Sequence, residues 1–63
     1  MNRELSCIAI DDEPMALLVI EQFCRRNGNI VLSTYSEPLV GMEEIKRRVP
    51  DLVFLDIQMN SIT

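Results

Sequence analysis

Histidine and tryptophan are absent from this sequence of 63 residues, and cysteine and glycine occur only twice each. Cys7 and Cys24 lack the spacing of metal-binding cysteines, so without histidine a zinc site is not expected. Both fall in segments that we expect to be buried, where free cysteine behaves as a small hydrophobic residue. A disulfide between them stays open as an alternative but is disfavoured in a reducing compartment.

Long hydrophobic runs are also missing. No apolar stretch approaches the roughly eighteen residues that span a bilayer, and the one after "MNRELSC" is too short for a signal peptide. Acidic residues outnumber basic ones by ten to six, and the net charge of −4 argues against a protein that binds the phosphate backbone of nucleic acids. We therefore expect a cytoplasmic chain with no membrane partner and no nucleic-acid partner of its own.

A chain this short allows one small domain at most, and such a domain buries only about 60% of the surface of its unfolded chain. Within it, apolar runs alternate with helical patterns, which predicts a β-α-β-α-β order. Strands are expected at residues 5–10, 30–35 and 52–55, helices at residues 14–26 and 36–50, and a loop at residues 58–63. The first and third strands have the continuous apolar character of strands buried on both faces.

The spacing of apolar residues predicts the buried face of each helix. In the first helix the inward residues are Leu17, Ile20, Phe23 and Cys24. In the second helix they are Leu39, Met42, Ile45 and Val49. Gly41 lies inside the second helix, where glycine costs up to about 1 kcal/mol relative to alanine.

Acidic residues end two of the predicted strands: Asp11 and Asp12 follow the first, and Asp56 follows the third. Strand-helix-strand connections are right-handed in nearly all proteins, which leaves few arrangements of this order. If the chain reverses direction across the sheet after the second strand, the strands lie in the order 2-1-3 with one helix on each face. The carboxyl ends of the first and third strands then place the three acids around one small space, where open α/β sheets bind ligands.

Three carboxylates so close together require a cation. Two unit charges 4 Å apart repel by about 4 kcal/mol at an effective dielectric constant near 20. Oxygen ligands without nitrogen or sulfur favour Mg²⁺, and a carboxylate beside this metal can act as a nucleophile toward a phosphoryl group. Taken singly, the acids have simpler interpretations, with Asp12 and Glu13 as caps of a helix and Asp56 as a turn residue. Together they predict phosphoryl acceptance on Asp56.

Three segments, "CIAIDDEP", "SEPL" and "DLVFLDIQM", together resemble the receiver domain of bacterial two-component response regulators. The wording around the acids is most similar to the LytR/AlgR type, whose receivers usually precede a LytTR DNA-binding domain. The resemblance covers the whole chain and implies a flavodoxin-like α/β fold, truncated so that residues 1–63 form its N-terminal half as a single incomplete domain. The strand order 2-1-3 is also the order of that fold family.

The resemblance implies a role for each candidate residue. Asp56 is the phosphoacceptor and hence the catalytic residue, while Asp11 and Asp12 hold Mg²⁺, with Asp12 the more direct ligand. Asp56 itself and the backbone carbonyl of Gln58 complete the protein's share of the metal coordination. A sensor histidine kinase is the implied phosphoryl donor, and only an output domain beyond this chain would contact DNA. Apart from self-phosphorylation on Asp56, the chain is not expected to be an enzyme.

Two departures from the family pattern keep a second hypothesis open. Asn60 stands where the family usually has proline, and the chain ends at Thr63, before the strands that carry a hydroxyl residue and a lysine. The isolated chain is therefore expected to resemble a folding or assembly unit without phosphotransfer competence. Its third strand and uncovered sheet faces predict a homo-oligomer, formed through residues 52–55. An aspartate-nucleophile phosphatase is disfavoured, because Gln58 stands where such an enzyme usually carries a second acid.

Overall fold

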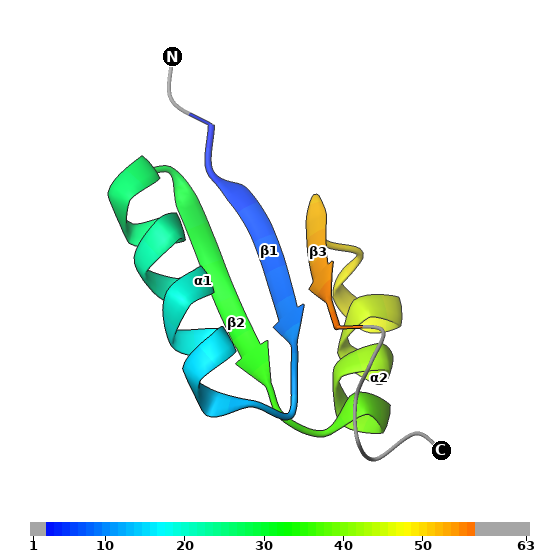
Figure 1. Ribbon diagram of the computed structural model, residues 1–63. Coiled ribbons are helices and arrows are strands. Elements are labelled where there is room, and N and C mark those ends of the chain that lie inside the picture. Colours follow the sequence, from blue (N-terminus) through cyan, green and yellow to red (C-terminus); the bar gives the residue numbers. More distant parts are fainter. Residues whose placement is uncertain (1–2, 57–63) are drawn as a thin grey trace.

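The computed structural model describes residues 3–56, which contain five elements in the predicted order (Figure 1). They are β1 (Leu5–Ile10), α1 (Pro14–Asn27), β2 (Ile30–Tyr35), α2 (Pro38–Arg48) and β3 (Leu52–Leu55). All three strands have the predicted bounds, whereas α1 ends one residue later than predicted and α2 two residues earlier. The loop predicted at residues 58–63 lies outside the described residues. Neither described helix is long and apolar enough to cross a membrane.

The three strands form one parallel sheet in the order β2-β1-β3, so β1 is the central strand, as predicted. At the carboxyl end of the sheet, Ile10 of β1 pairs with Tyr35 of β2 on one side and with Leu55 of β3 on the other. The strands therefore end at nearly the same level. Whatever follows β1 and β3 in the chain begins at this shared edge.

The two faces of β1 are covered by different helices. Side chains three positions apart on a strand point to opposite faces, as Cys7 and Ile10 do. Burial, with the Cys24 thiol of α1 nearby, raises the pKa of Cys7, whereas Ile10 lies directly against Gly41 of α2. All four residues from Cys7 to Ile10 are at most 1% exposed. The prediction of a central strand with a helix on each face is confirmed.

The predicted inward face of α1 is wrong at one position. Cys24 is buried and Leu17 and Ile20 are half-buried, but the Phe23 side chain is 54% exposed. Consecutive helical residues are about 100° apart, so Phe23 and Cys24 cannot both point at the centre of the sheet. The helix turns its smaller side chain inward, and the larger ring lies on the outer surface.

The predicted inward face of α2 is wrong at three of its four positions. Leu39 is 79% exposed and Met42 is also exposed, and only Ile45 packs against the core. Val49 lies beyond the helix as its left-handed cap, with φ +47, so it is not on a helical face at all. The face that packs on the sheet runs through Gly41, which is buried, because a residue without a side chain allows the helix the closest approach.

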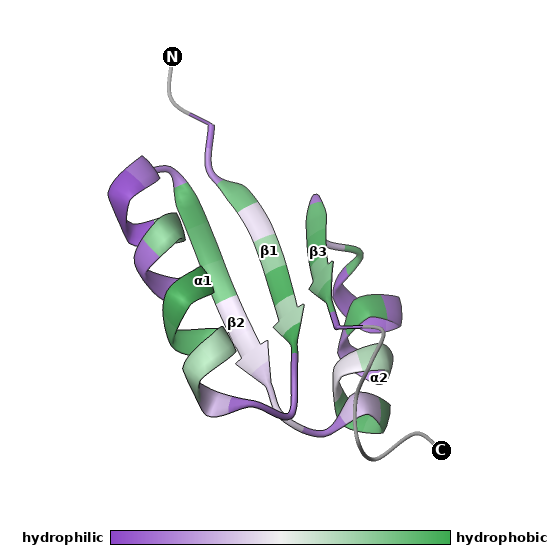
Figure 2. Cartoon of the chain, viewed as in Figure 1, coloured by the Kyte–Doolittle hydropathy of each residue, from purple (hydrophilic) through white to green (hydrophobic). Residues whose placement is uncertain are grey.

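The third strand is an apolar edge. Leu52, Val53 and Leu55 are exposed in β3, contrary to the prediction that this strand is buried on both faces. Figure 2 shows β3 as an almost continuous hydrophobic strand beside β1. Within the described residues β3 is hydrogen-bonded only to β1. An open edge of this kind is a template for pairing with another strand.

Asp51 fixes the other end of the β1–β3 pair. Its carboxylate accepts a hydrogen bond from the Ser6 amide at 2.8 Å and pairs with the Arg3 guanidinium at 2.9 Å. The Asp51 amide in turn donates to the Ser6 carbonyl at 2.7 Å. These bonds hold the amino end of β3 in register with β1. They thereby help to set which residues meet at the carboxyl end.

Candidate metal centre

The candidate site begins with the register of β1 and β3. Ile10 pairs with Leu55, so the residues that follow these two strands, Asp11 and Asp56, leave the sheet side by side. The Asp56 amide donates to the Ile10 carbonyl at 3.3 Å, which continues the ladder by one bond and places Asp56 against the end of β1. Two acids 45 positions apart in the sequence are brought together by one strand pair.

Asp11 is anchored by two hydrogen bonds. Its amide donates to the Tyr35 carbonyl of β2 at 3.1 Å, and its Oδ1 accepts a hydrogen bond from the Glu13 amide at 3.0 Å. The residue is only 8% exposed. A buried carboxylate held by a backbone N–H has few orientations left. Asp11 is therefore a preorganised acid that offers one carboxylate oxygen to the cluster.

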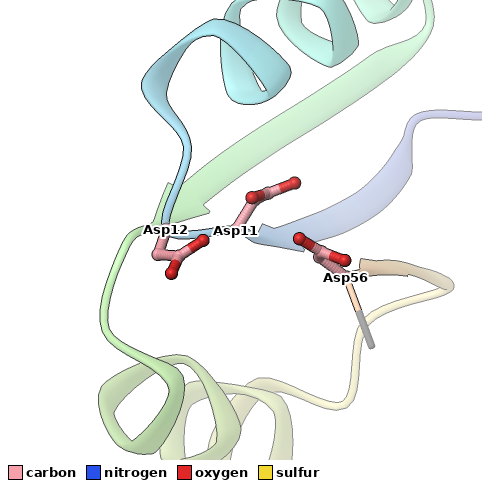
Figure 3. A group of neighbouring side chains, drawn as sticks. All are labelled: Asp11, Asp12 and Asp56. Atoms are coloured by element: carbon pink, nitrogen blue, oxygen red, sulfur yellow. The ribbon is translucent and has the colours of Figure 1, made fainter. Parts of the chain in front are cut away.

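Asp12 and Asp56 complete the acidic cluster, and both are half-buried. Asp11, Asp12 and Asp56 each offer one carboxylate oxygen, and these three oxygens lie within 4.8 Å of one another. Figure 3 shows Asp11 and Asp12 projecting from the end of β1 and the loop after it, and Asp56 from the end of β3. The predicted convergence of the three acids is confirmed.

The donor set fits a hard divalent cation. Ligands bound to octahedral Mg²⁺ at 2.0–2.1 Å lie about 3 Å apart when adjacent and about 4 Å apart when opposite. Oxygens within 4.8 Å of one another need only small side-chain movements to reach such spacings. All three donors are carboxylates, which suit Mg²⁺ and not the metals that prefer nitrogen or sulfur. The arrangement can hold one cation and still leave positions for water or a phosphoryl oxygen.

Two sequence expectations about this site have separate outcomes. The Gln58 carbonyl, predicted as a further metal ligand, lies outside the described residues. The simpler interpretation of Glu13 combined capping with compensation of the helix dipole. Glu13 does occupy the N-cap position of α1, but the capping part is wrong, because its side chain makes no capping hydrogen bond. The carboxylate that bonds to backbone N–H at this turn belongs to Asp11 instead.

Two contributors to the site were missed by reasoning from the sequence. The Tyr35 carbonyl holds Asp11, and Gly41 lies against Ile10, the residue immediately before Asp11. A backbone carbonyl leaves no signal in the sequence. Gly41 did leave one, because a glycine inside an otherwise regular helix is unfavourable unless a close contact requires it.

Comparison with known proteins decides the family. Residues 7–63 match the response regulator receiver domain family. The chain belongs to the response regulator receiver domain family. Receiver domains are generally signalling modules rather than enzymes, and they typically bind Mg²⁺ at an acidic cluster of the kind that Asp11, Asp12 and Asp56 form here.

Three curated relatives support the assignment of this receiver. Uncharacterized response regulatory proteins of Vibrio vulnificus (strain CMCP6) and Vibrio cholerae serotype O1 are each 38% identical to it over 60 residues. One of Vibrio parahaemolyticus serotype O3:K6 is 35% identical over the same length. Each match covers 94% of the receiver chain but only 25% of the relative. No solved structure matches the chain.

Proposed function

We propose that the response regulator to which these residues belong accepts a phosphoryl group on Asp56 in a Mg²⁺-dependent reaction. The observation that supports the proposal is the meeting of three carboxylates at the carboxyl edge of β1 and β3, with their oxygens within 4.8 Å. Asp56 is the acid contributed by β3, and it faces the pair from β1 across this space. Two acids can thus hold a cation while the third reacts beside it.

The chemistry assigns a different task to each acid. Asp11 is anchored by the Glu13 amide and Asp12 follows it in the loop, so these two carboxylates would hold the cation. A carboxylate oxygen of Asp56 attacks phosphorus, the bond from phosphorus to the donor nitrogen of a kinase histidine breaks, and that nitrogen keeps the electron pair. Mg²⁺, when bound, neutralises charge between the acid and the phosphoryl oxygens.

The same proposal includes the wider setting of the receiver. We place it in the LytR/AlgR type, on the "IDDEP" and "LDIQM" segments that carry Asp11, Asp12 and Asp56. Residues 1–63 would form the N-terminal half of the receiver domain, in keeping with relatives of which the chain spans a quarter. A histidine kinase in the cytoplasm would be the partner, and a LytTR domain outside these residues would bind DNA.

Intact-mass measurement tests phosphoryl acceptance. The protein expressed from its complete reading frame is incubated with an acyl phosphate and Mg²⁺, beside the 63-residue chain alone. We expect one added phosphoryl group per molecule of the former. The addition should fail when EDTA is present and in Asp56→Asn, and it should be kept in Glu21→Gln. Glu21 is the matched control because it is an exposed acid on α1 outside the cluster.

The outcomes separate the two functional hypotheses. No phosphoryl group on the complete protein, or one that persists in Asp56→Asn, would refute the phosphoacceptor assignment. We expect the 63-residue chain alone to remain unmodified, because the hydroxyl residue and lysine implied by the family resemblance are not among its residues. A phosphoryl group that accumulates on Asp56 of this short chain would refute the view that it is only a folding or assembly unit.

The exposed edge supports this second function, self-assembly of the 63-residue chain. Leu52, Val53 and Leu55 of β3 are exposed along an open strand. We propose that a second copy pairs with this edge and extends the sheet. Light scattering at micromolar concentration is expected to show a dimer or larger species, and Val53→Lys is expected to shift it toward monomer, because a charge on an edge strand opposes pairing. A compact monomer of the parent chain would contradict assembly.

A further inference from the structure

We infer that Gly41 is a positioning residue for the acidic cluster, acting through its contact with Ile10. The inference rests on the proposed function, because it takes the cluster to be a divalent-cation site. Gly41 belongs to α2, and the atoms nearest to its Cβ position all belong to Ile10. Its influence is transmitted by the last residue of β1, on which α2 rests.

The contact between α2 and β1 leaves no room for a side chain at position 41. A Cβ built on Gly41 would lie 2.5 Å from both Cδ1 and Cγ1 of Ile10 and 3.4 Å from its Cγ2. Carbon atoms in ordinary contact are about 3.5–4.0 Å apart, so Ile10 or the helix would have to move by about 1 Å. Gly41 is therefore required by the size of Ile10.

Ile10 cannot absorb that movement in its side chain alone. It is 1% exposed, and Tyr35 and Ile45 pack against the small core that it forms with Ile8. Interiors are packed as densely as organic crystals, so an enclosed side chain has no empty space into which it can turn. The displacement would pass to the backbone of β1 or to the position of α2.

The Ile10 backbone is where the acids are held together. Its carbonyl accepts the amide of Asp56 at 3.3 Å, and the next residue is Asp11, whose amide is bonded to Tyr35. A shift of this peptide therefore changes the separation of Asp11 and Asp56 directly. Sites built for a cation tolerate little such change, and supporting residues around metal sites typically affect affinity by about 10–100-fold.

The direction of the effect distinguishes this role from an ordinary helix position. Alanine is favoured over glycine inside a helix, so helix propensity alone predicts that Gly41→Ala is stabilising and leaves Mg²⁺ binding unchanged. The contact with Ile10 instead predicts that Gly41→Ala lowers the stability of the fold and weakens Mg²⁺ binding. A pure packing role would lower stability while leaving the affinity of the folded chain for Mg²⁺ intact.

Isothermal titration of the chain with Mg²⁺ tests the inference, with the folded fraction checked by circular dichroism. We expect Gly41→Ala to weaken Mg²⁺ binding by about tenfold. Gly28→Ala is the matched control. Gly28 has φ +84 at the end of α1 and nothing within 4 Å of its Cβ position, so alanine there strains the backbone far from the acids. This control is expected to lose stability and to keep its Mg²⁺ affinity.

Rescue supplies the decisive comparison. Ile10→Ala removes Cδ1 and Cγ1, the two atoms that lie 2.5 Å from the Cβ position, so Gly41→Ala combined with Ile10→Ala is expected to recover most of the lost affinity. If Gly41→Ala alone fails to fold, the double variant must still fold and bind. A folded Gly41→Ala chain with parental affinity, an equal loss in Gly28→Ala, or no rescue would overturn the inference. A parent chain that binds no Mg²⁺ would instead refute the proposed function.

Discussion

At the scale of single residues, one backbone position in the part of the chain that the structure describes is unfavourable for its side chain. Among the described residues, Val49 is the one non-glycine residue with positive φ, at +47. Its amide donates to the Ile45 carbonyl at 2.9 Å, closing α2 as a left-handed cap. Glycine is the usual residue there, because a Cβ in this conformation costs roughly 1–2 kcal/mol.

Val49→Gly is therefore expected to stabilise the fold. The Val49 side chain is 78% exposed, so little packing is lost when it is removed. We expect the free energy of unfolding to rise by about 1 kcal/mol, measured by urea denaturation. Val40→Gly is the control: it lies on the exposed side of α2 with ordinary helical geometry, and is expected to lower stability. A decrease in stability for Val49→Gly would show that the cap is not strained.

At the scale of elements, α2 carries an ion pair that makes its stability depend on pH. The Arg47 guanidinium donates two hydrogen bonds to the Glu44 carboxylate, one of them from Nε at 3.2 Å. These bonds, with the charges of Arg47 and Arg48, hold the pKa of Glu44 below its ordinary value of 4.5. A carboxylate whose pKa is lower in the folded protein than in the unfolded chain stabilises the fold at pH values above the pKa of the unfolded chain. This contribution disappears as the pH falls through the pKa of the folded protein.

Glu44→Gln is expected to lose less stability on acidification than the parent chain does. We expect the difference in melting temperature between parent and variant to be constant above pH 4.5 and to shrink as the pH is lowered further. The effect is small, because the pair is at the surface and screened by solvent. Glu43→Gln, one residue earlier, is the control and should lose stability at low pH as the parent chain does. A difference that stays constant down to pH 2 would contradict the assigned role of this pair.

Elements were predictable from the sequence to different extents. The strands were found because continuous apolar runs such as the one ending at Ile10 have no helical spacing. The inward faces of the helices were predicted only in part, because hydrophobic periodicity counts apolar side chains such as Leu39 and Phe23 and gives no weight to Gly41. Tertiary packing decides how closely α2 approaches β1, and the closest contact is at Gly41, which has no side chain.

The site was more predictable than the faces of the helices. Acids at the ends of neighbouring parallel strands must meet once the strand order is known, and this placed Asp11, Asp12 and Asp56 correctly. What the sequence could not supply was the support beneath them. The hydrogen bond from Asp11 to the Tyr35 carbonyl and the contact between Ile10 and Gly41 depend on backbone atoms and on distances.

At the scale of the whole molecule, a small core supports a concentrated charge. Five buried hydrophobic residues make up the core among the described residues, four of them in β1. The strand that supplies this core also ends in two of the clustered acids. Like charges at such spacing repel by a few kcal/mol at an effective dielectric constant of about 20. A cation at the cluster would therefore stabilise the fold as well as prepare the reaction, by mass action.

The most direct test of the central claim, that Asp11, Asp12 and Asp56 share one divalent cation, is a Mg²⁺ titration followed by the amide resonances of the chain. We expect saturable shifts at the carboxyl ends of β1 and β3, absent in Asp56→Asn and retained in Glu21→Gln, which alters an exposed acid of α1 outside the cluster. Shifts gathered instead around Glu43 and Glu44 of α2, or none at millimolar Mg²⁺, would contradict the account.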